Sequence, residues 1–488
     1  MTSNFLSFLI VVGFMMVALF IGLRGYRVTQ RTAEDYFLAS RSLGTAVLLL
    51  TMFATLMSSF TFFGGPGNVY ATGMEWMLVM GLMDGFLVAL LWYVVGARQW
   101  RVGRRHRYIT VGEMLGDRFN STVLRVLVAV VSLFWLFPYV MMQQMGAGYA
   151  LSGLTGGAIP FGVGAGLITA FMIIYVALGG MRGVAWTDTF QGLVMLVCVW
   201  VALIVIGRSA GGVNAAGARV MEEAPRVFTL GDPWTPQAMW SAAIGTALGV
   251  ISFPQINQRF FVGRSSAVLR RAFILWPILC LLLFLPAFLI GAWGAGLVPG
   301  LEKPDTVLSV MLGDFAPWWF ASIVISGALA AMMSSSDSML LSAGSYLTHD
   351  VYKRLVDPGA DARRENLVGR VMVVTFALVA YLFSLRSPGS LVAIGLLAFG
   401  GFAQLTPVLL VSLYWKRATG VAMILAVVLS EGFYLLSKFT PLLPGTYAGW
   451  DASMVGVVLA TVVLVGVSAV TAPRDGERPE VFFGTSGN

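Results

Sequence analysis

Apolar stretches long enough to cross a lipid bilayer recur along the whole chain. A helix needs about 20 predominantly apolar residues to span the hydrocarbon core, and thirteen such stretches can be delimited. They cover residues 6–23, 46–70, 77–95, 123–151, 159–178, 184–206, 239–261, 272–294, 318–345, 367–385, 391–413, 420–437 and 454–471. We therefore predict an all-α integral membrane protein with thirteen transmembrane helices.

The composition argues against the main alternatives. Only 11% of the 488 residues are charged and 58% are hydrophobic, whereas about a quarter of an average soluble domain is charged. This excludes a soluble enzyme, a nucleic-acid-binding protein and a disordered chain. The alternating pattern of an outer-membrane barrel is not seen. The sequence contains no phosphate-binding loop, no nucleophile elbow and no Cys/His metal spacing, so we do not expect an enzyme.

The basic residues predict the orientation in the membrane. The first stretch has no basic segment before it and is followed by Arg24, so we expect a retained span with its N-terminus outside rather than a signal peptide. With thirteen spans, all but six of the 31 Lys and Arg residues then lie on or near the cytoplasmic face, including the groups at 98–107, 259–271 and 353–370. Inner-leaflet lipids favour this asymmetry. We predict a multi-pass protein of the cell membrane with a cytoplasmic C-terminus.

Two of the predicted spans are interrupted by residues that break helices. The second span has hydroxyl residues at Ser58 and Ser59, with a Gly/Pro cluster at 64–67, and the seventh contains Pro254. Non-helical backbone at that depth is tolerated where it lines a cavity, and its free carbonyl groups are good ligands for Na⁺. The alternative is a simple kink with close helix packing.

The two interruptions occur five spans apart, which suggests an inverted repeat of five plus five spans. The predicted organisation is an extra N-terminal helix and cytoplasmic loop (1–45), the first repeat (46–206), an exterior loop (207–237), the second repeat (238–414), two peripheral helices (415–472) and a cytoplasmic tail (473–488).

Polar residues within the spans are the candidates for function. The ninth span carries four serines and Asp337 within residues 334–338, a cluster whose density favours cation coordination over structural hydrogen bonding. Asp188 lies about one turn inside the cytoplasmic end of the sixth span, where it can bind an ion or pair with a nearby Arg. Tyr139 and Gln143 lie midway along the fourth span, where an amide can hydrogen-bond a polar solute.

Several motifs in the same order resemble those of the sodium:solute symporters, which have the five-plus-five fold of the bacterial leucine transporter. The motifs lie at residues 35–44, 54–67, 179–191 and 333–338, followed by Asp350-Val351-Tyr352. The 64–67 stretch and residues 188–196 are most similar to the pantothenate-type branch. Leu56 stands where the proline-transporting branch has an acid.

The resemblance implies three groups of site residues. The principal Na⁺ site would use Ala54, Met57, Ala331, Ser334 and Ser335. A possible second Na⁺ would be bound by Asp188, Asp337 and Ser338. The solute site would be lined by Ser58, Ser59, Phe60, Tyr139, Gln143, Phe253, Gln255, Phe399 and Gln404.

The predicted function is uptake of a small polar organic solute, coupled to inward Na⁺ flow by alternating access, in a protein that works as a monomer. The solute would be an organic anion such as pantothenate, an amino acid or a sugar. Two alternatives remain open: a membrane solute sensor on the same fold that acts through a separate partner, and a symporter coupled to protons instead of Na⁺.

Overall fold

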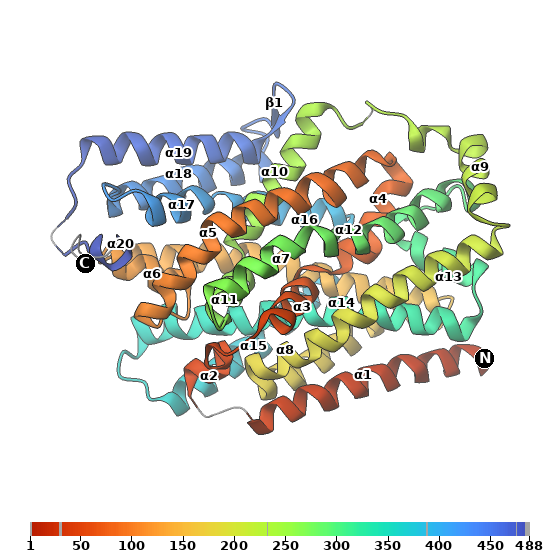
Figure 1. Ribbon diagram of the computed structural model, residues 1–488, viewed down its shortest axis with the longest axis horizontal. Coiled ribbons are helices and arrows are strands. Elements are labelled where there is room, and N and C mark those ends of the chain that lie inside the picture. Colours follow the sequence, from red (N-terminus) through yellow and green to blue (C-terminus); the bar gives the residue numbers. More distant parts are fainter. Residues whose placement is uncertain (1, 29–31, 232, 387–388, 475, 484–488) are drawn as a thin grey trace.

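The computed structural model describes residues 2–28, 32–231, 233–386, 389–474 and 476–483. It shows a helical protein with one two-stranded hairpin (Figure 1). Parts of the predicted C-terminal tail, residues 475 and 484–488, lie outside the described residues.

The bounds of the elements are as follows. The α-helices are α1 (Thr2–Val28), α2 (Ala33–Leu38), α3 (Thr45–Leu56), α4 (Gly65–Thr72), α5 (Gly85–His106), α6 (Val111–Arg118), α7 (Thr122–Leu154), α8 (Phe161–Ser209), α9 (Val213–Glu223), α10 (Pro236–Ser252), α11 (Pro254–Val262), α12 (Ser266–Leu297), α13 (Val307–Phe315), α14 (Trp318–Ser345), α15 (Ala362–Ser384), α16 (Leu391–Ala403), α17 (Thr406–Tyr414), α18 (Gly420–Phe439), α19 (Ala452–Val470) and α20 (Glu480–Phe483). Shorter turns and π-helical segments are η1 (Ala39–Arg41), η2 (Phe60–Gly64), η3 (Met77–Asp84), η4 (Pro225–Phe228), η5 (Pro304–Thr306) and η6 (Tyr346–Val356). Strands β1 (Thr446–Tyr447) and β2 (Trp450–Asp451) pair antiparallel.

Within the described residues, ten helices are long and apolar enough to cross a membrane. Two bent pairs raise this number to twelve: Thr45–Leu56 with Phe60–Thr72, bent by 61°, and Pro236–Ser252 with Pro254–Val262, bent by 56°. The remaining predicted span, 159–178, coincides with a shorter apolar helical stretch, Phe161–Ile174. The all-helical membrane class is therefore confirmed, with ten to twelve candidate spans.

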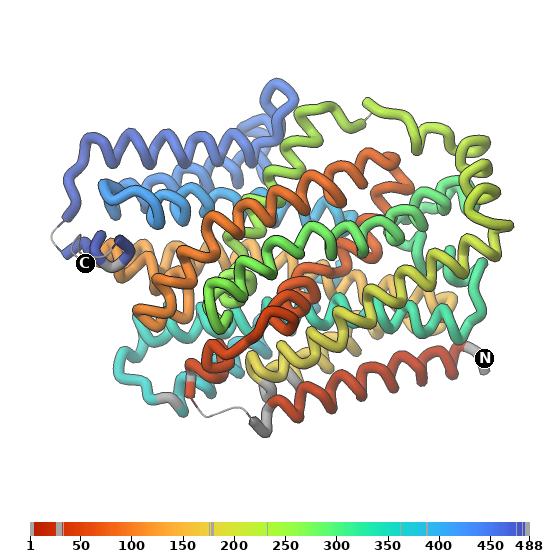
Figure 2. The backbone as a smooth tube through the Cα atoms, viewed as in Figure 1, coloured from red at the N-terminus to blue at the C-terminus, as the bar shows by residue number. Residues whose placement is uncertain are grey.

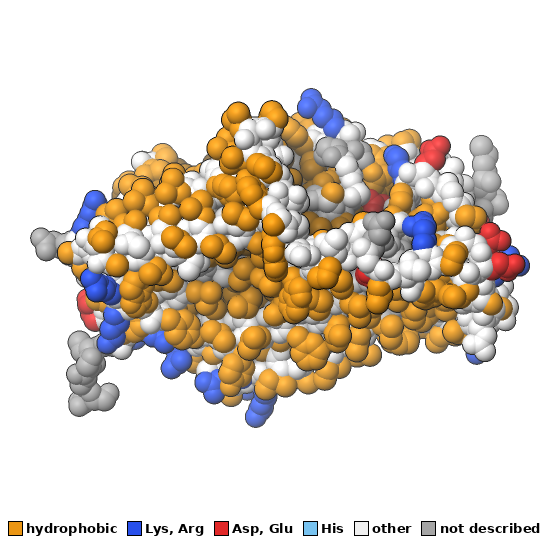
Figure 3. Space-filling model, turned by 90° about the horizontal axis from the view of Figure 1, so that it is seen from above, with side chains coloured by type: hydrophobic (Ala, Val, Ile, Leu, Met, Phe, Trp, Pro, Cys, Tyr) orange, Lys and Arg blue, Asp and Glu red, His pale blue; other side chains and the backbone are white. Residues whose placement is uncertain are grey.

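The long helices run broadly along the longest axis of the molecule, and the chain starts and finishes at opposite ends of it (Figures 1 and 2). One end carries α2, α6 and α20 and is called the α2 end; the other carries α9 and α13 and is called the α9 end. Figure 3 shows a mostly hydrophobic flank with most charged side chains toward the two ends. Large apolar side chains such as Phe20, Phe86 and Val123 are exposed on the helices, as expected of a surface that contacts lipid.

Local backbone chemistry explains the two bends. Phe253 is extended (φ −60°, ψ 127°) because the ring of a following proline disfavours helical geometry in the residue before it. Met57 is also extended (φ −73°, ψ 120°). Beyond it, side chains replace the helical bonds, since the N–H of Ser59 donates to Gln143 Oε1 and that of Phe60 to Ser58 Oγ.

Two glycines permit close approaches that shape the core. Gly180 has φ 58° and interrupts α8, and a Cβ there would lie 2.9 Å from the Tyr36 carbonyl oxygen. Gly249 on α10 packs so closely on α16 that a Cβ would lie 2.4 Å from the Phe399 carbonyl oxygen. The second contact brings the break after α10 against the aromatic residues of α16.

A set of hydrogen bonds and ion pairs holds the segment before α3 in place at the α2 end. Asp35 is fully buried and accepts hydrogen bonds from Nε and Nη2 of Arg182 on α8, at 3.0 and 2.8 Å. Arg41 pairs with Glu34 at 2.8 Å and donates to the carbonyl groups of Tyr108 and Phe261. These contacts join the segment before α3 to α8, α11 and the loop after α5.

Candidate ion and solute site

The break after α3 meets the serine cluster of α14 at the centre of the molecule. Ser335 Oγ donates to the Met57 carbonyl oxygen at 2.9 Å, and Ser334 Oγ donates to Asp188 Oδ1 at 2.6 Å. The side chains of Ser334 and Ser335 are completely buried. The structure therefore brings together the two segments that the sequence assigns to the principal cation.

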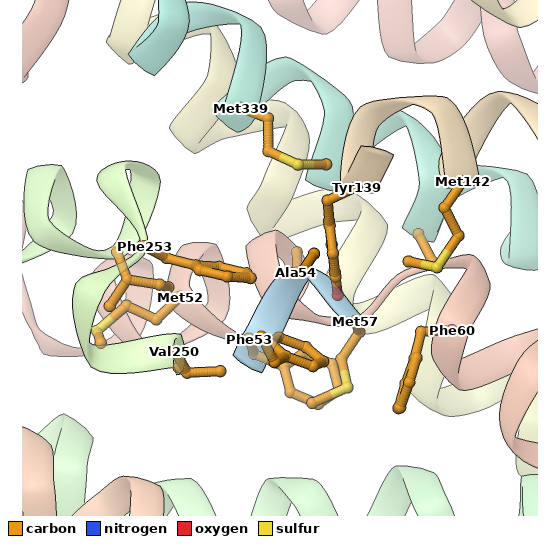
Figure 4. Packing of buried hydrophobic residues seen from close by; sticks show 14 of the residues in the cluster. Met52, Phe53, Ala54, Met57, Phe60, Tyr139, Met142, Val250, Phe253 and Met339 are labelled. Atoms are coloured by element: carbon orange, nitrogen blue, oxygen red, sulfur yellow. The ribbon is translucent and has the colours of Figure 1, made fainter. Parts of the chain in front are cut away.

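The remaining residues predicted for the principal ion lie beside this contact. Ala54 is in the last turn of α3, where the helix ends and carbonyl groups lose their continuing N–H partners; Figure 4 shows it next to Met57. Ala331 lies on α14 one turn before Ser335. Among the described residues, no group of three or more His, Cys, Asp or Glu is placed to hold a metal. A cation here would be bound by carbonyl and hydroxyl oxygens, the ligands of hard ions.

Two of the three residues predicted for a second ion, Asp188 and Ser338, contact a guanidinium group. Arg259 on α11 is fully buried, and its Nη2 lies 3.1 Å from Asp188 Oδ2 and donates to Ser338 Oγ. Thr51 on α3 also donates to Asp188 Oδ2. Of the two roles that the sequence left open for Asp188, the structure shows pairing with an arginine. Arg259, which the sequence counts among the basic residues on or near the cytoplasmic face, is carried by α11 and buried inside the protein.

Asp337 does not join this group. It is completely buried on α14, and neither of its carboxylate oxygens has a hydrogen-bond partner within the described part of the chain. An ionised carboxylate is costly to bury without donors or a counter-ion. Burial of this carboxylate is therefore unfavourable in the ionised form unless a cation or donor approaches it.

Most of the predicted solute residues surround the same break. Ser58 Oγ and Tyr139 Oη are hydrogen-bonded at 3.3 Å, and Gln143 Oε1 accepts the N–H of Ser59 at 2.9 Å. Figure 4 shows Tyr139 with its hydroxyl directed toward the turn that carries Met57, and Phe253 and Phe60 on different sides of it.

An aromatic cluster closes around this turn. Phe253 stacks on Phe399 with ring centres 5.2 Å apart, and Tyr139 contacts both rings edge-on. Phe60 contacts Phe399 edge-on at 5.7 Å and Trp76 at 6.0 Å. The cluster joins the two broken segments with α7 and α16, so a solute bound at the turn would meet aromatic faces and a few polar groups, as in most small-molecule sites.

The two remaining glutamines behave differently. Gln255 is fully buried and neither amide atom has a partner among the described residues, so it is available to a polar solute. Gln404 lies apart from the cluster, because its Nε2 donates to the carbonyls of Gly400 and Ser453 and its amide packs on Gly456 of α19. Its amide therefore links α16 to α19.

A cavity of about 530 Å³ lies at the α9 end, beyond the aromatic cluster. Basic side chains Lys303 and Arg386 line it together with Glu302 and Asp305. The Asp305 carboxylate accepts the N–H of Leu391 at the start of α16, while burial raises the pKa of Asp305 to about 6.

Sequence reasoning missed Arg259 and Thr51. A signal was present for Arg259, since a carboxylate predicted inside a span requires a counter-ion and Arg259 follows the proline break by only five residues. Nothing distinguished Thr51 from other hydroxyl residues in the spans.

Comparisons with known proteins identify the family and the fold of the chain. A model of the sodium:solute symporter family matches residues 36–428. The chain is 29% identical to the sodium/pantothenate symporter of Escherichia coli (strain K12), with 88% of this chain and 91% of that protein covered. It is also 29% identical to the high-affinity proline transporter PutP of Bacillus subtilis (strain 168), with 81% and 85% covered. Among solved structures, a Na⁺-coupled sialic acid symporter in a substrate-bound outward-open state superposes with a TM-score of 0.81 at 20% identity, with 96% of this chain and 98% of that chain covered. That structural similarity shows a shared fold.

Proposed function

Because the chain belongs to the sodium:solute symporter family, it is a Na⁺-coupled transporter and not an enzyme, and we propose that it takes up a small carboxylate-bearing solute by alternating access. Pantothenate, proline and sialic acid, which name the similar proteins, all carry a carboxylate group. The observation that carries the Na⁺ coupling in this proposal is the bond between Ser335 on α14 and the Met57 carbonyl at the break after α3.

One short segment would contact both ligands. Met57 and Ala54 would present carbonyl oxygens to Na⁺, with Ala331, Ser334 and Ser335 completing its shell. Ser58 and Ser59 follow directly in the chain and would face the solute, together with Phe60, Tyr139, Gln143, Phe253, Gln255 and Phe399. Binding of Na⁺ would order the turn, and the solute would then bind without bearing that ordering cost.

The membrane arrangement is part of the proposal. We infer thirteen spans, with the stretch Phe161–Ile174 as one of them, two five-span repeats at 46–206 and 238–414, and a monomer as the working unit. We place the N-terminus outside and the α2 end in the cytoplasm. The helix α1 starts at one end of the molecule and α20 lies at the other, as an odd number of crossings requires. The basic residues near the α2 end support its placement in the cytoplasm, because cytoplasmic loops are enriched in Lys and Arg.

The test is uptake into proteoliposomes that contain purified protein. Radiolabelled pantothenate and proline are supplied with Na⁺ outside and K⁺ inside, and a Na⁺-dependent thermal shift across a panel of carboxylates widens the search. Saturable accumulation of one carboxylate that stops when external Na⁺ is replaced by K⁺ supports the proposal. Binding without uptake would support a sensor instead, and uptake driven by a proton gradient without Na⁺ would support proton coupling.

A further inference from the structure

The Arg259 guanidinium lies at the meeting point of three elements. Its Nη2 contacts Asp188 on α8 and Ser338 on α14, and lies 3.4 Å from Thr51 Oγ1 on α3. Both charged side chains of the pair are completely buried. The positive charge is thus held by a carboxylate and two hydroxyl oxygens, which is the kind of ligand set that a hard cation uses.

This cluster adjoins the principal ion site. Asp188 uses Oδ2 for Arg259 and Oδ1 for Ser334, and Ser334 is one of the residues proposed to bind Na⁺. Ser338 also lies 3.0 Å from Thr55 Oγ1 on α3. A second Na⁺ on Asp188 and Ser338 would have to displace Nη2, and the displaced guanidinium would remain a like charge close to the ion in a buried site.

We propose that Arg259 is a tethered cation that takes the place of a second Na⁺, so that the protein binds one Na⁺ per chain. This inference rests on the proposed Na⁺-coupled function and adds the ion stoichiometry to it. Arg259 acts as a specificity-determining residue, because it satisfies the carboxylate of Asp188 that would otherwise attract another ion. Arg259 belongs to α11, the second half of a broken helix, so its positive charge cannot dissociate as a bound Na⁺ can.

The inference also gives the broken segments an electrostatic link. Arg259 follows the break at Phe253 by six positions, and Thr51 precedes the break at Met57 by six. Both side chains converge on Asp188 Oδ2. Ser334, a proposed Na⁺ ligand, bonds to the other oxygen of the same carboxylate, so the ion site adjoins the link between α11 and α8.

The experiment counts bound ions with ²²Na⁺ on purified full-length protein in a scintillation proximity assay, which needs no knowledge of the solute. The wild type is expected to bind one ²²Na⁺ per chain, without cooperativity. Arg259→Gln is expected to bind two, because Asp188 then lacks its counter-ion. Arg259→Lys keeps the charge and is expected to bind one, and so is the neutral double variant Asp188→Asn/Arg259→Gln.

Several outcomes would overturn the proposal. Two ions on the wild type would do so whether or not any variant folds, and a fall from two to one in Asp337→Asn would then assign the second ion to that unpartnered carboxylate. One ion on a monodisperse Arg259→Gln protein, or two on the double variant, would also contradict it. No ²²Na⁺ binding by the wild type would instead defeat the proposed Na⁺-coupled function, and the inference with it.

Discussion

Replacing Ser335 by alanine removes one proposed Na⁺ ligand and one hydrogen bond. In the structure the hydroxyl is fully buried and lies 2.9 Å from the Met57 carbonyl oxygen. A hydrogen bond to a charged group contributes about 1.5–3 kcal/mol, and every 1.4 kcal/mol changes an equilibrium constant tenfold. We expect Ser335→Ala to raise the Na⁺ concentration for half-maximal ²²Na⁺ binding by about 10- to 100-fold.

The same helix offers a matched control. Ser326 is also buried on α14, but its Oγ donates to the Ser322 carbonyl at 2.8 Å within the helix. Ser326→Ala loses a neutral hydrogen bond of about 1 kcal/mol without losing a ligand. Thermal unfolding in detergent should therefore move down by a few degrees in both variants, whereas Na⁺ affinity should fall in Ser335→Ala alone. Equal Na⁺ half-saturation in the two folded variants would refute the assignment of Ser335 to the ion.

Three further predictions address the buried pair, the α9-end cavity and coupling. Asp188→Asn leaves Arg259 buried without a counter-ion and should lower the free energy of unfolding by about 3–5 kcal/mol. The double variant Asp188→Asn/Arg259→Gln should recover part of this loss. Thermal unfolding measures the stability of both variants, and an unchanged melting temperature in Asp188→Asn would contradict the pairing. Since burial raises the pKa of Asp305 from 3.8 to about 6, its protonated form is favoured on folding. This shift adds about 3 kcal/mol to the free energy of unfolding below about pH 4, and the contribution is lost by about pH 6. The melting temperature of the wild type should therefore fall relative to that of Asp305→Asn between these pH values. A difference in melting temperature that does not change with pH would argue against the raised pKa. Finally, calorimetry should show a carboxylate solute bound at least about fivefold more tightly in Na⁺ than in K⁺, with a smaller ratio in Ser335→Ala; equal affinities would remove the coupling.

Much of the candidate site follows from local chemistry, and for that reason the sequence predicts it. The effect of Pro254 on Phe253 acts between neighbouring residues, and hydroxyl side chains can replace helical bonds at Ser58 and Ser59. The clustering of Ser334 and Ser335 with Asp337 in an apolar span is visible without any structure. Each of these signals lies within one turn of chain.

The rest depends on contacts that no local pattern encodes. Asp188 and Arg259 are 71 positions apart, and the rule that assigns basic residues to the cytoplasmic face counts charges without measuring depth. Gln404 follows Phe399 by five residues in the sequence, yet five positions on a helix turn a side chain by about 140°. Only the packing of α16 on α19 decides where that amide points.

The segment before α3 at the α2 end has one further property, which comes from its backbone. Ala39, Ser40 and Arg41 have φ values of 48°, 52° and 55°, three successive left-handed residues, each of which costs roughly 1–2 kcal/mol with an L side chain. Their side chains nevertheless fasten the segment, since Ser40 bonds to Asp35 and Arg41 to Glu34, Tyr108 and Phe261. These hydrogen bonds therefore oppose the conformational cost of the three left-handed residues, so the net free energy that holds the segment is smaller than its contacts alone would give.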